Sequence, residues 1–172
     1  MTLFNTKPAR LIVPGFHPDP SICQTSDGRL LAAFSSFEYD PGLPVYESTD
    51  NGKTWSFCSH AASRPSQFTS TPLGNSQGFY APTIRDHNGT VYLIVTDVNR
   101  GAMIFHTRDV HGQWDDPLFI HGWPGIDPSL FFDDDGTVYV CGNEAGGGDE
   151  KPGIYAAPIN PDTAEVTGPR TF

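Results

Sequence analysis

Two aspartates occupy matching places in the sequence, each directly before a proline that opens a short apolar run. Asp19 stands in the segment HPDPSIC, and Asp127 stands in the distant segment GIDPSLF. Two carboxylates that meet in one pocket supply what acid–base catalysis needs. An Asp-Pro pair also starts turns and caps strands, so the spacing alone leaves a structural role open.

The two aspartates belong to a pattern that occurs three times, in segments 17–36, 79–97 and 125–143. Each copy has a proline, a short apolar run, a polar turn with glycine and a second apolar run. The turns contain Asp-Gly, Asn-Gly and Asp-Gly, which are strong hairpin signals because a type I′ turn requires two residues with positive φ. The proline and glycine of each copy, with offsets of 8, 7 and 8 residues, are Pro20 and Gly28, Pro82 and Gly89, and Pro128 and Gly136.

A second repeat follows the first two hairpins, where segment 45–55 aligns with segment 104–114, and the strand-like segment 153–169 follows the third hairpin. Each unit therefore predicts three strands plus a short fourth. The units begin 62 and then 46 residues apart, and a polar loop near 59–78 lengthens the first spacing. Four-stranded repeats of about 40–50 residues are typical of β-propeller blades.

These repeats predict an all-β fold, the N-terminal part of a single β-propeller that fills the whole chain. The approximate blades are residues 12–78, 79–124 and 125–172. Because propellers close with about 4–8 blades, we expect three blades to need missing C-terminal blades or self-association. The first strand of each blade lines the propeller axis, so Asp19 and Asp127 are expected at one end of the central funnel.

The composition is that of a globular chain. Its 172 residues allow one domain, and 37% hydrophobic residues are too many for a disordered protein. A net charge of −10 argues against partners such as nucleic acids and anionic membranes. No apolar run predicts a transmembrane helix or a signal peptide, so a cytoplasmic location is expected if the N-terminus is native. Three separated cysteines are typical of free thiols: Cys23, Cys58 and Cys141.

Longer segments around the repeats resemble glycoside hydrolase family 43. In chain order they are PGFHPDPSIC, SSFEYDPGLPVYESTD, FYAPTIRDHNGTVYL and GIDPSLFFDDDGTVYV. The resemblance runs from about residue 12 to the C-terminus and is strongest to the β-xylosidase and α-L-arabinofuranosidase branch. It implies a five-bladed propeller and an inverting glycosidase for terminal β-xylosyl or α-L-arabinofuranosyl units of plant polysaccharides or oligosaccharides. It implies no diffusible cofactor.

The resemblance also implies roles for individual residues. Asp19 matches the general base, and Asp127 matches the aspartate that raises the pKa of the general acid. The acid itself, a glutamate in a Glu-Gly-Pro-His-like segment, has no counterpart in this sequence, so we expect the chain alone to be inactive. Phe37 and Tyr80 are expected to stack on sugar, because pyranose faces are apolar. By its position two residues before Asp19, His17 is expected to line the pocket wall or to form a hydrogen bond there, and to contact the sugar.

The residues also support other interpretations. The chain could be a non-catalytic carbohydrate-binding or partner-dependent fragment. As a separate alternative, Phe37 and Tyr80 could simply pack between blades. No metal site is expected, because the aspartate run 133–135 is better interpreted as a turn and the histidines lack paired ligand spacing. The family resemblance allows a structural calcium, which this sequence does not support. The segment 48–55 predicts a turn stapled by Asp50.

Overall fold

The structure of the protein is a computed structural model that describes residues 11–38, 42–70, 74–144 and 151–172. Its described residues form three four-stranded antiparallel sheets. The first sheet contains β1 (Ser21–Gln24), β2 (Leu30–Ala33), β3 (Gly42–Ser48) and β4 (Ser56–Ala62). The second contains β5 (Thr83–His87), β6 (Thr90–Asp97), β7 (Gly101–Thr107) and β8 (Leu118–Phe119). The third contains β9 (Ile126–Phe132), β10 (Val138–Glu144), β11 (Gly153–Asn160) and β12 (Glu165–Val166).

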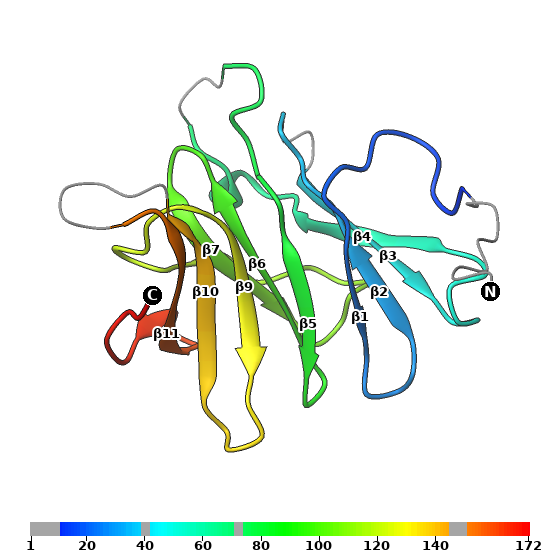
Figure 1. Ribbon diagram of the computed structural model, residues 1–172. Helices are drawn as coiled ribbons and strands as arrows, with labels where there is room; N and C mark the ends of the chain where they lie inside the picture. Colours follow the sequence, from blue (N-terminus) through cyan, green and yellow to red (C-terminus); the bar gives the residue numbers. More distant parts are fainter. Residues whose placement is uncertain (1–10, 39–41, 71–73, 145–150) are drawn as a thin grey trace, which may run out of the picture.

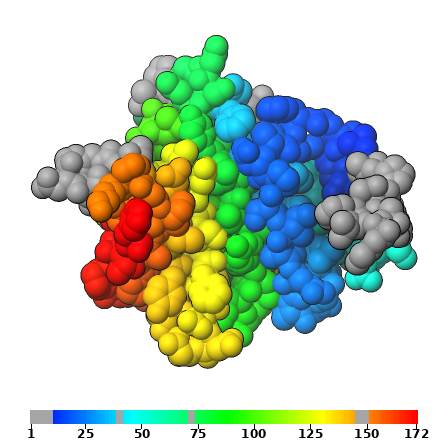
Figure 2. Space-filling view, in the orientation of Figure 1, coloured from blue at the N-terminus to red at the C-terminus, as the bar shows by residue number. Residues whose placement is uncertain are grey.

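The strands of each sheet follow one another in sequence order, as in an up-and-down propeller blade. Figure 1 shows the three sheets next to one another, with their first strands β1, β5 and β9 adjacent, and β5 contacts both β1 and β9. In the space-filling view of Figure 2 the sheets form neighbouring sectors from blue through green to red. The predicted all-β, partial propeller architecture is therefore confirmed.

Two apolar cores lie between the sheets, one on each face of the second sheet. Leu93 of β6 packs in the core shared with the first sheet, and Ile94 packs in the core shared with the third. Neighbouring residues of a strand point to opposite faces, so a strand buried on both faces needs a continuous apolar run. The sequence VYLIV in β6 is such a run, and all five of its residues are buried.

The three glycine turns form hairpins, but the predicted turn type is correct at one of them. Asn88 and Gly89 both have positive φ, 53° and 77°, as a type I′ turn requires. At the other two turns only the glycines, Gly28 and Gly136, have positive φ. There the glycine amide donates three residues back, as from Gly28 to the Thr25 carbonyl at 2.9 Å. One extra residue in these loops favours a type I turn that ends in a left-handed glycine.

The prediction of a polar loop near 59–78 is partly wrong. Its first residues belong to β4, which is seven residues long, whereas the fourth strands β8 and β12 are short as expected. A 3-10 helix, η1 (Pro65–Gln67), follows. The Gln67 side chain is fully buried, accepts a hydrogen bond from the Arg64 amide at 2.9 Å and donates one to the Asp115 carbonyl at 3.1 Å. The Gln67 side chain thus provides hydrogen-bond partners for backbone groups of the connection between the sheets, and buried backbone groups need such partners.

The segment 48–55 is a turn stapled by side chains, as predicted. The Thr54 amide and hydroxyl donate to the two carboxylate oxygens of Asp50, at 2.8 and 2.7 Å. The Gly52 amide donates to the Ser48 hydroxyl at 2.8 Å. These hydrogen bonds lower the pKa of Asp50 to about 2, and the bond from the Thr54 hydroxyl contributes most.

All three cysteines are described and none forms a disulfide. They lie on different strands, β1, β4 and β10. None of the helices in the described part of the chain has the length and apolar character needed to span a membrane.

Candidate active site

A cavity of about 380 Å³ contains both predicted carboxylates. Its lining residues are Asp19, Phe37, Ser76, Tyr80, Ala81 and Asp127. Asp19 directly precedes the proline before β1, Ala81 holds the same place before β5, and Asp127 stands at the start of β9. The structure therefore brings the matching positions of the three repeats to one end of three adjacent strands.

Asp19 and Asp127 share an unusual backbone conformation. Both have φ of 53°, in the left-handed region that residues with a side chain rarely adopt. A residue before proline ordinarily takes an extended conformation. Asp19 and Asp127 depart from it in the same way, so the backbone is strained at the same position of both repeats. Strain of this kind concentrates at functional sites, where the surrounding fold holds a side chain in a required direction.

Asp127 also sits at an irregularity of the third sheet. Ile126 pairs with Asn143 and Ser129 pairs with Cys141, so the register of β9 on β10 shifts between these pairs. A β-bulge twists the strand and redirects the side chains within it. The bulge therefore accounts for how β9 presents the Asp127 carboxylate to the cavity and not along the regular sheet face.

Ser35 holds Asp19, and sequence reasoning did not single it out. Its buried hydroxyl donates to Asp19 Oδ2 at 2.7 Å, and its amide donates to the Pro18 carbonyl at 3.1 Å. The hydroxyl engages one carboxylate oxygen, and the carboxylate keeps lone pairs on the other for a water molecule. The one sequence feature that could have indicated Ser35 is its position two residues before Phe37, in the segment SSFEY.

The carboxyl group of Asp127 is affected by its surroundings and by the charge of Asp19. Partial desolvation, and then the negative charge of Asp19, raise the pKa of Asp127 above its ordinary value. Like charges in one cavity disfavour a second ionisation, so Asp127 retains a proton more readily than an isolated aspartate. The arrangement is thus a pair of carboxyl groups in which the charge of Asp19 favours the protonated form of Asp127.

Two aromatic rings form the walls of this cavity. The Phe37 and Tyr80 rings meet edge to face, with centroids 5.7 Å apart and an interplanar angle of 85°. The Tyr80 hydroxyl donates to the Ser76 carbonyl at 3.3 Å, which fixes the ring against the cavity rim. The structure therefore brings Phe37 and Tyr80 together with the carboxylates, and apolar ring faces beside carboxylates suit a sugar ligand.

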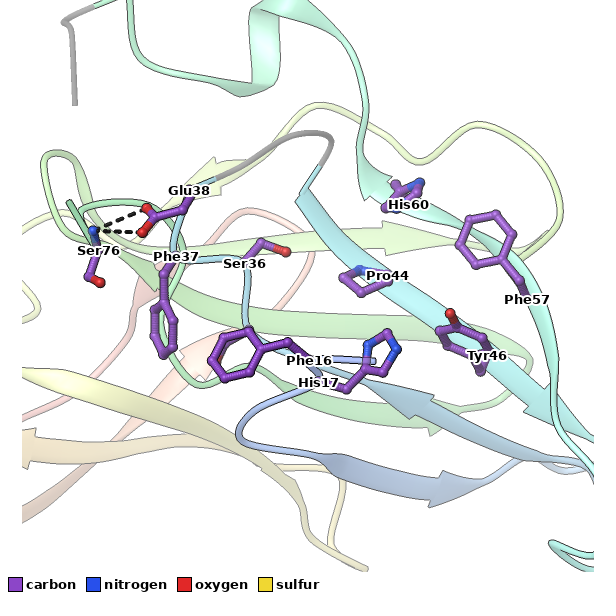
Figure 3. Close-up of a pocket in the computed structure, with 11 residues that line it drawn as sticks. Phe16, His17, Ser36, Phe37, Glu38, Pro44, Tyr46, Phe57, His60 and Ser76 are labelled. Atoms are coloured by element: carbon purple, nitrogen blue, oxygen red, sulfur yellow. Dashed lines mark hydrogen bonds between the residues drawn. The ribbon is translucent and has the colours of Figure 1, made fainter. Parts of the chain in front are cut away.

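His17 lines the wall of the adjoining cavity. This cavity of about 820 Å³, shown in Figure 3, shares Phe37 and Ser76 with the carboxylate cavity. The His17 ring packs against Phe34 and Tyr46, with centroids 4.9 and 5.5 Å away. Ser35, which holds Asp19, lines the same cavity as His17. The contact of His17 with sugar stays a prediction.

The rim between the two cavities is fastened by Glu38, a second residue that sequence reasoning missed. The Ser76 amide donates to both carboxylate oxygens of Glu38 at 3.1 Å, and Figure 3 shows this pair beside the Phe37 ring. Ser76 has a φ of 55°, so this contact stabilises a left-handed turn at the rim. No motif marked Glu38, because its partner is 38 residues away in the chain.

The fold and the site together define a partial propeller with paired carboxylates and aromatic walls at one end of three adjacent strands. The family model for glycosyl hydrolases family 43 matches residues 8–172. The chain belongs to this family.

The chain is similar to several known proteins, and in each of them the similarity covers only part of that protein's length. The chain is 43% identical over 136 residues to a xylosidase/arabinosidase of Butyrivibrio fibrisolvens, covering 76% of this chain and 25% of that protein. It is 40% identical over 136 residues to a non-reducing end α-L-arabinofuranosidase of Bacteroides ovatus, covering 74% and 24%. The solved xylan β-1,4-xylosidase of Bacillus halodurans matches with a TM-score of 0.82 and 35% identity, covering 92% and 32%. The chain spans about a quarter to a third of these relatives.

Proposed function

We propose that the chain forms the general-base part of an inverting glycosidase site for terminal β-xylosyl or α-L-arabinofuranosyl units. The observation that carries this proposal is one cavity that holds Asp19, Asp127 and two aromatic rings. The printed names of the relatives support the choice of sugar, since they include xylosidases and an arabinofuranosidase.

In the proposed reaction, Asp19 accepts a proton from water as the water attacks the anomeric carbon. The Ser35 hydroxyl holds the carboxylate in position through the bond to Oδ2. Phe37 and Tyr80 contact the apolar face of the sugar. Asp127, with its raised pKa, stands beside the place where a general acid would protonate the leaving oxygen.

No residue that lines the carboxylate cavity fits the role of the general acid. None of the five glutamates in the sequence stands in a Glu-Gly-Pro segment, and none of the glutamates that the structure describes lines the carboxylate cavity. Departure of an alkoxide leaving group needs a proton donor, whereas a dinitrophenolate leaves without one. The chain alone is therefore expected to release dinitrophenol slowly from dinitrophenyl glycosides and to leave xylobiose intact.

An assay of the purified chain tests this proposal. The expected results are slow turnover of dinitrophenyl β-xyloside or α-L-arabinofuranoside and inversion at the anomeric carbon by proton NMR. Asp19→Ala should abolish turnover, and azide, an anion that needs no base, should restore it as an inverted glycosyl azide. Asp134→Ala is the matched control, because Asp134 lies in the turn at the opposite end of β9. Turnover unchanged in Asp19→Ala would overturn the base assignment.

A second candidate function, carbohydrate binding without catalysis, is favoured by the missing acid and the partial length of the chain. Saturation-transfer NMR with xylose and arabinose distinguishes the two. Sugar binding that Tyr80→Ala weakens, together with no turnover of either dinitrophenyl glycoside, would support this candidate over the first.

A further inference from the structure

Three metal-binding side chains from distant parts of the chain meet where the first two sheets join. Glu47 of β3, Cys58 of β4 and His111 of the β7–β8 connection place one ligand atom each within 4.8 Å of one another. His111 Nε2 and Glu47 Oε1 are 3.1 Å apart. None of these three residues lines the carboxylate cavity, so the cluster is independent of the proposed glycosidase site.

We propose that Glu47, Cys58 and His111 bind a divalent transition-metal ion of the zinc class. A thiolate, an imidazole and one carboxylate oxygen are the donors that zinc prefers, whereas calcium and magnesium prefer oxygen alone. Three protein ligands leave the fourth tetrahedral position for water. Ligand atoms around a tetrahedral zinc lie roughly 3.3–3.7 Å apart. The three ligand atoms, all within 4.8 Å of one another, therefore need to move by about 1 Å at most to surround an ion.

The sheet geometry directs Cys58 toward this cluster. Val45 pairs with Ser59 and Tyr46 pairs with Phe57, so Cys58 is the extra residue of a β-bulge in β4. A bulge redirects the side chain of its extra residue.

The loop that carries His111 is held against β4 by hydrogen bonds from the residue next to Cys58. Ser59 Oγ donates to the Val110 carbonyl at 2.6 Å and accepts from Trp114 Nε1 at 3.0 Å. Trp114 is 1% exposed, so this attachment is part of the core. The backbones next to two of the three ligands are thus tied together before any ion binds, which lowers the entropy lost on binding.

Glu47 has the outer support that metal-binding carboxylates usually have. Its second oxygen, Oε2, accepts a hydrogen bond from Arg29 Nη1 at 2.9 Å, and Arg29 is in turn held by Asp27 at 2.9 Å. Such partners orient a carboxylate and leave its other oxygen for the ion.

The Cys58 thiol is protonated without an ion, because burial and then Glu47 raise its pKa to about 12. The bond from sulfur to metal therefore forms as the thiol proton leaves to solvent.

Equilibrium dialysis of the purified protein against Zn²⁺ and Co²⁺, after removal of metals with a chelator, tests the site. We expect one bound ion per chain and, with Co²⁺, a thiolate-to-metal charge-transfer band in the near ultraviolet. Cys58→Ser should remove the band and weaken binding at least tenfold. Cys141→Ser is the matched control, because Cys141 lies in β10 of the third sheet, and it should leave both unchanged.

His111→Asn provides a second variant that keeps the fold, since His111 is an exposed loop residue. It should weaken Zn²⁺ binding at least tenfold and keep the melting temperature of the metal-free protein unchanged. Absence of a stoichiometric ion in the wild-type protein would overturn the proposal. A cobalt band that persists in Cys58→Ser and is lost in Cys141→Ser would also overturn it.

Discussion

At the scale of single residues, the candidate site depends on the charge of one carboxylate acting on another. Asp19 and Asp127 come from different repeats, and each has a positive φ, which is unusual for a residue before proline. Because the charge of Asp19 is the second cause of the raised pKa of Asp127, after desolvation, the coupling is directly testable.

Replacing Asp19 by Asn should lower the pKa of Asp127 and leave it above its ordinary value, because the charge is lost and the desolvation remains. Carbon-detected NMR titration of the Asp127 carboxyl measures this shift. Ser35→Ala keeps the charge of Asp19 and removes only its hydrogen bond, so it should change the pKa of Asp127 less. An unchanged pKa in Asp19→Asn would show that the two carboxylates do not interact.

A second residue-scale prediction concerns the pH dependence of stability. The folded pKa of Asp50, about 2, lies below the value of about 3.9 for an unfolded aspartate. Asp50 therefore contributes fully to the free energy of unfolding above about pH 5, and this contribution is lost as the pH falls toward 2. Asp50→Asn should lower the melting temperature at pH 6 and have progressively less effect down to pH 2.

Asp134→Asn is the control for this experiment, because it removes the same charge from an exposed turn. Its effect on the melting temperature should be small throughout the pH range. A melting-temperature difference between Asp50→Asn and the wild-type protein that is the same at pH 6 and pH 2 would contradict the prediction.

At the scale of elements, segment 78–80 connects the first sheet to the second beside the site. Phe79 exchanges two backbone hydrogen bonds with Ser36, at 3.1 and 2.9 Å, and the Tyr80 amide donates to the Thr96 carbonyl at 2.9 Å. These bonds position the Tyr80 ring against Phe37. The close backbone approach leaves no room for a side chain at Gly78, where an added Cβ would lie 2.5 Å from the Ser36 carbonyl oxygen.

Gly78→Ala should therefore destabilise the protein by about 1–3 kcal/mol, the usual cost of overpacking a rigid site. Urea unfolding measures this change, and weaker sugar binding should accompany it because Tyr80 shifts. Gly74→Ala is the matched control in the same connection, because its added Cβ meets only the flexible Gln77 side chain. Equal effects of the two substitutions would mean that the close approach at Gly78 does not constrain the fold.

At the scale of the whole molecule, the outward faces of the first and third sheets carry exposed apolar residues. On the third sheet, Phe131 and Ile154 are 57% and 63% exposed, and the strand register puts them on the face opposite the buried core. On the first sheet, Ile22 and Phe57 are 51% and 47% exposed. Leaving several hundred Å² of such surface uncovered costs on the order of 10 kcal/mol at ~25 cal/mol per Å², comparable with the stability of a whole domain.

The 172-residue chain expressed by itself should therefore self-associate. Size-exclusion chromatography with light scattering should give a mass well above 18.7 kDa. The double substitution Phe131→Glu and Ile154→Glu should shift the distribution toward monomer, whereas Val98→Glu, an exposed apolar residue of a second-sheet loop, should not. A sharply melting wild-type monomer would contradict this expectation.

The sequence by itself determined the features that depend on local patterns and their repetition. Turn glycines, strand alternation and three copies of one motif were sufficient to predict the all-β partial propeller. They also predicted that Asp19 and Asp127 lie in one site. The proline and glycine are 7 residues apart in the second repeat and 8 apart in the other two, and the second repeat is also the one whose turn is type I′. The prediction of a type I′ turn in the first and third repeats was wrong.

Only the tertiary structure decided which side chains from unlike segments meet. Ser35 reaches Asp19, Glu38 reaches Ser76, and His17 lies in the neighbouring cavity. The cluster of Glu47, Cys58 and His111 belongs to this group as well. A repeat predicts contacts between equivalent positions, because symmetry brings those together. Contacts between non-equivalent positions depend on bulges, loop paths and the packing of one sheet on the next, which have no local signature in the chain.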